Sequence, residues 1–397
     1  MAHRKVGVWF VGGRGSVATT ATVGALALAH RQTEAVGCVT ELPDLDGRGL
    51  PEYDALVTGG HDIGGGSLRK RAEQLSAGGV IPPALVTLLG DQLDSADERI
   101  REGVESGHPD QRSAVSRLVE DIRSFRREQD LDQVVVVDVS STEPRVDVGA
   151  AGESMQTLEA AWSRGEVPLP ASSVYACAAL LAGCGYVGFT PSTGVDVPAL
   201  HMLAEQQGLP YAGNDGKTGE TLLKSVLAPM FATRALRVRS WTSVNLLGGG
   251  DGQTLADPVA REAKTTSKTR GLESMLGGPV DGPMHIDYVR DLGDWKTAWD
   301  HVSFEGFLGA GMSMQFTWQG CDSALAAPLV LDLVRLVARA QSLGSSGPVR
   351  ELAFFFKDPA GSDEHRLSAQ WETLVDWSAR CGEQWSAAHP DRGVAGP

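Results

Sequence analysis

A glycine-rich turn between an apolar strand and a helix constrains the fold of this chain more than any other feature. Lys5–Val11 is a short apolar run typical of a buried strand, and the alanine- and threonine-rich segment that follows, to about His30, is typical of a helix. Between them, Gly13-x-Gly15-x-x-Ala18 fits the dinucleotide-binding pattern, whose small residues let a pyrophosphate approach the helix N-terminus. Its position after the first strand favours a dinucleotide site over a plain glycine turn. We therefore predict a doubly wound α/β domain.

The size and charge of the chain limit its partners. With 397 residues it can bury a large core, in about two domains. Its formal net charge of −15 argues against nucleic acid and membrane surfaces, so local cations have to hold any anionic substrate. The five cysteines lack metal-ligand spacing and indicate buried thiols in a reducing cytoplasm. The sequence has no signal pattern and no membrane-length apolar run. We expect a cytoplasmic protein, and we assign no metal ligands.

An acidic residue after the second strand of such a domain usually binds a ribose hydroxyl and disfavours the extra phosphate of NADP. Glu41 follows a predicted strand at residues 35–40, although it comes late for this role. The competing candidate is Asp62, which lies in Gly59-Gly60-His61-Asp62-Ile63. His61 in the same segment suits packing better than catalysis.

Two polar turns are further candidates for the site. Residues 132–139 form an apolar run, as in a parallel strand buried on both faces, and Ser140-Ser141-Thr142-Glu143 follows it. Ligands collect at the carboxyl ends of such strands, so this turn is either a cofactor contact or a helix cap. The second turn has the pattern G-x-D-x-K-x-G-x-T over residues 213–221. A triphosphatase phosphate loop does not fit it, because the lysine precedes the last glycine.

A second glycine-rich break lies within residues 239–268. Its first part alternates as a strand through Trp241, Ser243 and Asn245 and breaks at residues 248–252, where the backbone can approach a ligand. Asp257-Pro258 is typical of a helix start, and Lys264 and Lys268 would share one face of that helix. Adjacent ammonium groups repel each other unless an anion lies between them. The upstream glycines favour such an anion site over a solvated lysine face.

The last third mixes strands with one long helix. We predict strands at residues 285–292, 311–318 and 352–356, a short helix that opens at Asp294-Trp295-Lys296, and an apolar helix over residues 323–341. Asp322 precedes the long helix and can cap it, and Lys357 follows the last predicted strand.

Taken together, these motifs resemble the inositol-phosphate synthase family, which are sugar-6-phosphate cyclases that hold NAD. The resemblance rests on SVNLLGGGDG followed by AKTTSK, on the 213–221 loop, on the Asp294-x-Lys296 and Cys321-Asp322-Ser323 elements and on Lys357. It covers most of the chain and implies a Rossmann-type NAD-binding domain (1–221), an inserted α+β catalytic and oligomerisation domain (222–321) and a return to the first domain (322–397). It also implies a homotetramer.

The resemblance implies a role for each matching residue. The implied catalytic residues are Lys264, Lys268, Lys296, Lys357, Asp215 and Asp322. The implied NAD contacts are Gly12, Gly13, Arg14, Gly15, Ser16, Val17, Asp62, Ser140, Ser141, Asp215 and Asp322. The implied substrate contacts are Thr218, Asn245, Gly249, Asp251, Lys264, Lys296 and Lys357.

The implied reaction converts glucose 6-phosphate, a hexose 6-phosphate, into an inositol phosphate. It proceeds by oxidation, enolisation, intramolecular aldol closure and reduction, with no net redox change. Gly249-Gly250 departs from the two asparagines that are common in the family, which affects the substrate more than the reaction type. Fructose 6-phosphate, closed to a five-membered cyclitol phosphate, is therefore an alternative. An NAD-dependent dehydrogenase of a small anion and a non-catalytic NAD sensor are the other two.

Overall fold

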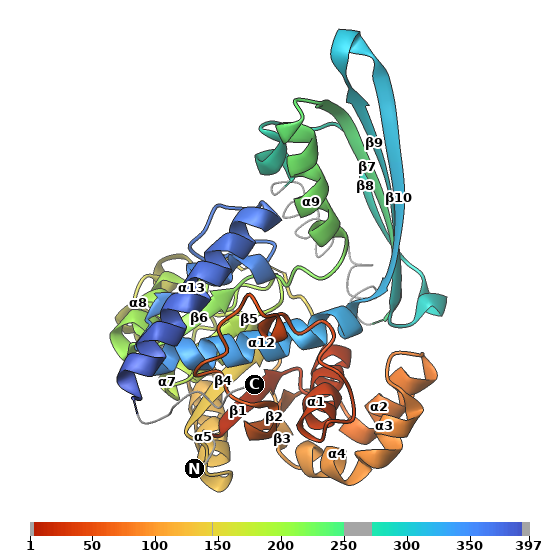
Figure 1. The fold of residues 1–397 in the computed structure, drawn as a ribbon. Coiled ribbons are helices and arrows are strands. Elements are labelled where there is room, and N and C mark those ends of the chain that lie inside the picture. The colour runs from red at the N-terminus through yellow and green to blue at the C-terminus, as the bar shows by residue number, and fades with distance from the viewer. Residues whose placement is uncertain (1–3, 145, 250–271, 391–397) are drawn as a thin grey trace.

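The computed structural model of the chain describes residues 4–144, 146–249 and 272–390. Within these ranges the strands form one seven-stranded and one four-stranded sheet. Figure 1 shows the larger sheet wrapped by helices and the smaller sheet projecting away from that body.

The larger sheet is parallel throughout and has the order β3-β2-β1-β4-β5-β6-β11. Its strands are β1 (Val6–Val11), β2 (Leu56–Asp62), β3 (Ile100–Glu102), β4 (Gln133–Asp138), β5 (Gly185–Gly188), β6 (Pro210–Gly213) and β11 (Gly347–Pro348). From β1 the chain proceeds outward in one direction, and from β4 in the other. This is the predicted doubly wound Rossmann arrangement, whose topological switch point lies between β1 and β4.

The core lies on both faces of this sheet, because side chains of β1 alternate between the faces. Val6, Val8 and Phe10 pack with α1 (Ser16–Ala29) and α12 (Asp322–Ser342). Trp9 and Val11 point to the opposite face and pack with helices α5 (Gln111–Glu128), α7 (Ala171–Leu181) and α8 (Pro198–Gln207). The remaining helices of the body are α2 (Leu68–Ala77), α3 (Pro83–Leu88), α4 (Gly90–Asp97), α6 (Met155–Ser163) and α13 (Leu367–Ala388).

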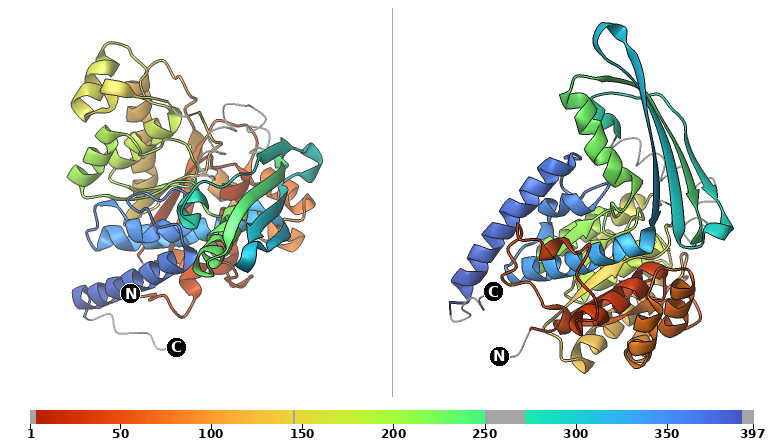
Figure 2. Two further views of the ribbon diagram at one scale, coloured as in Figure 1. Left: turned by 90° about the horizontal axis from the view of Figure 1, so that it is seen from above. Right: turned by 45° about the vertical axis from the view of Figure 1, so that its right-hand side comes forward.

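The smaller sheet has the order β10-β9-β7-β8, in which only the β7–β8 pair is parallel. Its strands are β7 (Arg237–Leu247), β8 (Met284–Tyr288), β9 (Trp295–Glu305) and β10 (Gly311–Cys321). Helix α9 (Glu220–Thr233) covers one face, where Phe231 contacts Trp241 and Phe304. The right-hand view of Figure 2 shows α9 alongside this sheet. No helix in the described ranges combines the length and apolar character of a membrane span.

Three predicted elements are wrong. Residues 35–40 form no strand: the described chain there has only a 3-10 helix at Val39–Glu41, and the second strand is β2. Asp294 ends a turn, and Trp295-Lys296 opens the long strand β9 instead of a helix. The predicted last strand is a 3-10 helix at Arg350–Phe355.

Candidate functional site

A cavity of about 860 Å³ opens at the carboxyl edge of the larger sheet, where its strand order reverses. Its walls come from the turns after β1, β2 and β4, from the loop after β6, from the ends of β7 and β9, and from the N-terminus of α12. In open α/β sheets this edge is where ligands bind. Segments far apart in the sequence therefore meet at one place.

The glycine turn after β1 forms one wall. The Gly12 and Gly13 amides donate to the His61 carbonyl oxygen, at 2.9 and 3.0 Å. Gly12 has φ +83°, and a Cβ atom there would lie 3.0 Å from Ser140 Cα, so this position requires glycine. Gly15 is the N-cap of α1 and offers no side chain to cap it. The turn thus presents bare backbone at a helix N-terminus, which fits the pyrophosphate of a dinucleotide.

Asp62 ends β2 and holds this turn in place. Its carboxylate accepts hydrogen bonds from the Arg14 and Gly64 amides, both at 2.6 Å, and it lines the cavity. The alternative acid, Glu41, instead forms an ion pair with Arg335 on α12. Of the two predicted ribose ligands, Asp62 is therefore the one positioned beside the glycine turn.

His61 lies within the core beside this turn. Trp9 Nε1 donates to His61 Nδ1 at 2.9 Å, so the other ring nitrogen, Nε2, carries the proton toward Asp121, at 3.1 Å. Burial lowers the pKa of His61, which keeps the ring neutral. Both ring nitrogens thus take part in hydrogen bonds to neighbouring side chains, which fits the packing role expected for this residue.

The turn after β4 forms the opposite wall. Ser140 donates hydrogen bonds through its amide and its hydroxyl to the Asp138 carboxylate. Burial raises the pKa of Asp138 to about 6. The Glu143 carboxylate accepts from the Ala171 and Ser172 amides at the start of α7. Ser140 and Ser141 line the cavity. Glu143 therefore caps a helix, whereas the cofactor contact of Ser140 and Ser141 stays a prediction for residues that line the cavity.

The loop after β6 lies against the segment that carries Lys357. The Lys357 amide donates to the Asp215 carbonyl at 2.7 Å, and Lys357 Nζ lies 2.8 Å from Asp215 Oδ1. Both residues line the cavity. Lys217, between Asp215 and Thr218, turns away and donates to Gln370 on α13.

Lys296 forms a second lysine–carboxylate pair. Its Nζ lies 3.5 Å from Asp322 Oδ1, which also accepts from Thr218 Oγ1 at 3.5 Å. Asp322 is the first residue of α12, but its side chain makes no capping hydrogen bond there, since the N-cap is Cys321. The strand β9 aims Lys296 at the cavity, and the helix start supplies its partner.

The other predicted site residues divide into three groups. Arg14, Gly15, Ser16, Val17 and Gly249 line the cavity. Gly13 and Asn245 are not among the described residues that line it; Asn245 is buried within β7. Asp251, Lys264 and Lys268 lie outside the described residues, as does the predicted helix that carries the two lysines.

Gly248 explains part of the glycine break after β7. A Cβ atom there would collide with the carbonyl oxygen of Gly293, and Gly249 has φ +62°. We predicted that these glycines let the backbone approach a ligand. The contact that requires Gly248 is instead with the turn before β9.

Sequence analysis missed several charged residues in or beside the cavity. Arg71 of α2 and Asp294 line it, and both contact the Ser16 hydroxyl. Buried Lys224 pairs with Glu220 at 2.5 Å and lies 3.6 Å from Asp300, behind the cavity wall. The i, i+4 spacing of Glu220 and Lys224 is a sequence signal for such a pair. Nothing comparable links Arg71 to Asp294, which lie 223 positions apart (294 − 71) in the chain.

Fold and cavity together define a class: a Rossmann-type dinucleotide-binding protein with two lysine–carboxylate pairs beside the cofactor loop. The family model described as myo-inositol-1-phosphate synthase matches residues 6–379. Inositol-3-phosphate synthase 1 of Bacteroides thetaiotaomicron is 31% identical over 408 residues, covering 94% of each chain. The chain therefore belongs to the myo-inositol-1-phosphate synthase family, whose members bind NAD, and it is an isomerase of that type.

Solved structures agree with this assignment. The structure of inositol-3-phosphate synthase from Caenorhabditis elegans superposes with a TM-score of 0.84 at 21% identity, covering 96% of this chain and 86% of that one. A myo-inositol-1-phosphate synthase-related protein from Thermotoga maritima superposes with a TM-score of 0.76 at 25% identity, covering 95% and 99%. At 21% identity, the likeness to the Caenorhabditis elegans structure shows the fold alone.

Proposed function

We propose that this protein is an NAD-dependent sugar-6-phosphate cyclase that converts glucose 6-phosphate to an inositol phosphate. One observation carries the proposal: Lys296 and Lys357, each paired with a carboxylate, line the same cavity as the glycine turn of the dinucleotide site. A dehydrogenase needs a hydride acceptor and one proton acceptor. A cyclase also needs cations at the oxygens that become negative during enolisation and ring closure.

The glycine turn, Arg14, Ser16 and Asp62 would hold NAD, and Ser140 would lie near it. NAD would supply reversible hydride transfer, so that the substrate ends with no net oxidation. Among the lysines, we assign Lys296 to the aldehyde oxygen that becomes an alkoxide, and Lys357 to the carbonyl or the phosphate. From the family resemblance we assign Lys264 to the enolate and Lys268 to proton transfer at the hydride step.

We also propose the domain division at residues 1–221, 222–321 and 322–397. The smaller sheet supports it, because all four of its strands fall within residues 222–321. In this division the cavity is shared, since Lys296 comes from the inserted segment and Lys357 from the return to the first domain.

The direct test supplies glucose 6-phosphate and NAD and identifies the product by mass spectrometry and NMR. We expect a phosphate monoester of a carbocyclic polyol, with the same mass as glucose 6-phosphate, and no accumulation of NADH. NADH formed in proportion to product would contradict the cyclase and indicate a dehydrogenase. NAD binding without turnover of any hexose 6-phosphate would indicate a sensor.

The two lysines can be tested separately from cofactor binding. Lys296→Met and Lys357→Met should each lower kcat by roughly 100-fold or more, because each removes a charge that stabilises an oxyanion. NAD should still bind, as calorimetry would measure. Lys70→Met on the exposed side of α2 is the matched control and should keep full activity. Near-normal rates in both cavity variants would refute the assignment.

Fructose 6-phosphate is the second candidate substrate. Gly249 lines the cavity and lacks the side-chain amide that an asparagine would place there, so a substrate hydroxyl loses one potential hydrogen-bond partner. Competition between the two hexose phosphates, followed by determination of the product ring size, decides between them. A five-membered cyclitol phosphate would establish the alternative.

A further inference from the structure

Three polar side chains meet across the cavity at the start of α1. Arg71 donates to Ser16 Oγ at 2.5 Å, and Ser16 Oγ donates to Asp294 Oδ1 at 2.6 Å. The Arg71 guanidinium and the same carboxylate oxygen lie 3.6 Å apart. Ser16 and Arg71 belong to the nucleotide-binding body, whereas Asp294 belongs to the turn that leads into β9. We call these residues the Ser16–Arg71–Asp294 clasp.

The clasp lies in the cavity wall and is reachable by a ligand. All its members line the cavity beside Gly12 and Gly15, and the Arg71 and Asp294 side chains remain 30% and 21% exposed. A partly exposed ion pair is weak, because water competes with each partner. A ligand with a stronger anion can therefore displace the carboxylate from the arginine.

The position of Asp294 is unusual for a purely structural acid. Asp294 Oδ1 accepts a hydrogen bond from Ser16 Oγ and lies 3.6 Å from the Arg71 guanidinium. Ser16 is the first residue of α1, the helix that follows the dinucleotide turn. A phosphate oxygen would use the same two donors, and Arg is well suited to phosphate because its fork of N–H groups can bind two oxygens. The carboxylate and a cofactor phosphate therefore compete for one location.

We propose that Asp294 is an anionic placeholder for a phosphate of NAD, and that Arg71 is a further ligand of that phosphate. Binding of the dinucleotide exchanges the carboxylate for the phosphate on Ser16 and Arg71. The exchange releases Asp294, two residues before Lys296 on the same segment.

The exchange is local, because other contacts keep the turn attached. Trp295 Nε1 donates to the Gly78 carbonyl at 2.9 Å, and Gly293 stays against Gly248. Loss of the carboxylate contact thus moves one side chain without detaching β9 from the body.

The test is isothermal titration of the full chain with NAD, with ADP-ribose and with adenosine, which lacks phosphate. Asp294→Asn should tighten NAD and ADP-ribose roughly three- to tenfold, because it removes the competing charge, and should leave adenosine unchanged. Arg71→Met should weaken NAD and ADP-ribose by roughly tenfold or more, and Arg71→Lys by less. The inference rests on NAD binding alone, so it survives if the sugar substrate is different.

Two nearby substitutions serve as controls. Asp291→Asn removes an exposed acid from the same turn, and Arg69→Met removes the arginine of α2 that pairs with Asp91 and Asp94. Both should leave all three affinities unchanged. Weaker or unaltered NAD binding in Asp294→Asn overturns the placeholder, as does equal tightening of adenosine. Unaltered NAD binding in Arg71→Met overturns the phosphate contact.

Discussion

At the scale of single residues, neighbouring polar side chains of the loop after β6 have different surroundings. Asp215 and Thr218 face the cavity, whereas Lys217 is buried against α13 with Gln370 Oε1 as its hydrogen-bond acceptor. Burial lowers the pKa of Lys217 to about 7. The two predicted site residues, Asp215 and Thr218, thus line the cavity, and Lys217 between them anchors the loop.

This anchor should make stability depend on pH. The unfolded lysine keeps its ordinary pKa of 10.5, so between about pH 7 and 10.5 the unfolded chain binds more protons than the folded one. The free energy of unfolding therefore rises with pH across that window. Relative to Lys217→Met, the wild-type chain should gain about 2 kcal/mol between pH 7 and 9. Urea unfolding at both pH values measures this, and parallel pH slopes for the two proteins would contradict it.

At the scale of elements, α12 holds the segment between α1 and β2, residues 30–55, whose only regular structure is two short 3-10 helices. Asp332 accepts hydrogen bonds from the Val39 and Thr40 amides, and burial raises its pKa to about 7. Arg335, one turn later, donates to the Pro51 carbonyl. Arg339 donates to the Asp46 carbonyl at 2.5 Å and to Ser378 Oγ on α13 at 3.2 Å. These charged side chains lie on the buried face of a helix that reads as apolar in the sequence.

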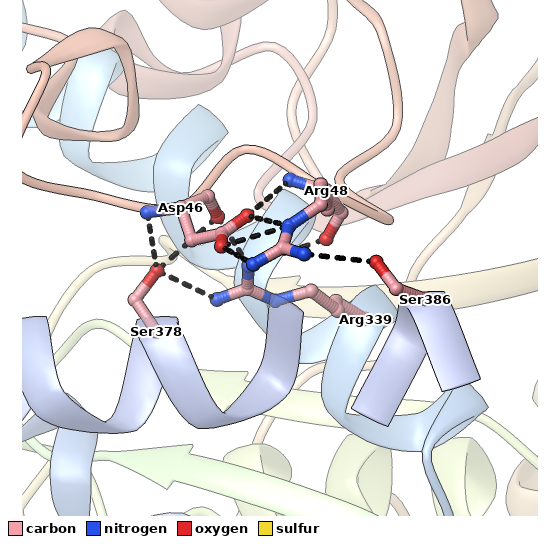
Figure 3. Close-up of polar contacts among 5 residues, drawn as sticks. All are labelled: Asp46, Arg48, Arg339, Ser378 and Ser386. Atoms are coloured by element: carbon pink, nitrogen blue, oxygen red, sulfur yellow. Dashed lines mark hydrogen bonds and ion pairs between the residues drawn. The ribbon is translucent and has the colours of Figure 1, made fainter. Parts of the chain in front are cut away.

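Figure 3 shows two arginines at the same segment, and they should differ in their contribution to stability. Arg339→Met leaves buried acceptors without a donor and should cost about 3 kcal/mol. Arg48 is exposed and pairs with Asp46 and Ser386, so Arg48→Met should cost less than about 1 kcal/mol. Chemical denaturation gives both values. Equal losses would show that burial does not distinguish the two arginines.

The same segment shows why part of the fold escaped prediction. Residues 35–40 look like a strand because they are apolar, yet Val36 is 83% exposed. The true second strand contains Gly59 and Gly60, which weaken its sequence signal. A Cβ at Gly59 would lie 3.0 Å from Phe125, and one at Gly60 would collide with the Phe10 carbonyl. These glycines are present because β1 and α5 pack so closely, and this packing cannot be read from local propensity.

Other parts were predictable because the signal is local. The turn after β1, the apolar run of β4 and the alternation of β7 are complete within a few residues, and each is confirmed. Lys296, Lys357, Asp215 and Asp322 were named only through the family resemblance, and their pairing could not be predicted because the partners lie far apart in sequence. The clasp at Ser16 had no sequence signal at all.

At the scale of the whole molecule, the predicted homotetramer remains a prediction with one suggestive surface. Phe307 and Leu308 are 88% and 90% exposed at the turn between β9 and β10. Light scattering after size exclusion should give four times the 41.9 kDa chain mass for the wild-type protein. Replacing both residues with serine should lower that mass if the turn contacts another copy, because exposed apolar groups favour association. A wild-type mass of one chain would contradict the tetramer.

The chain passes between the two sheets at two described places, and both border the cavity. One passage runs from β6 through Asp215 and Thr218 into α9, and the other runs from β10 directly into α12 at Asp322. Together with the Ser16–Asp294 and Trp295–Gly78 hydrogen bonds, these two passages join the smaller sheet to the body. Lys296 lies on the smaller sheet and Asp322 at the start of α12, so the 3.5 Å separation of Lys296 Nζ and Asp322 Oδ1 depends on how the smaller sheet sits against the body.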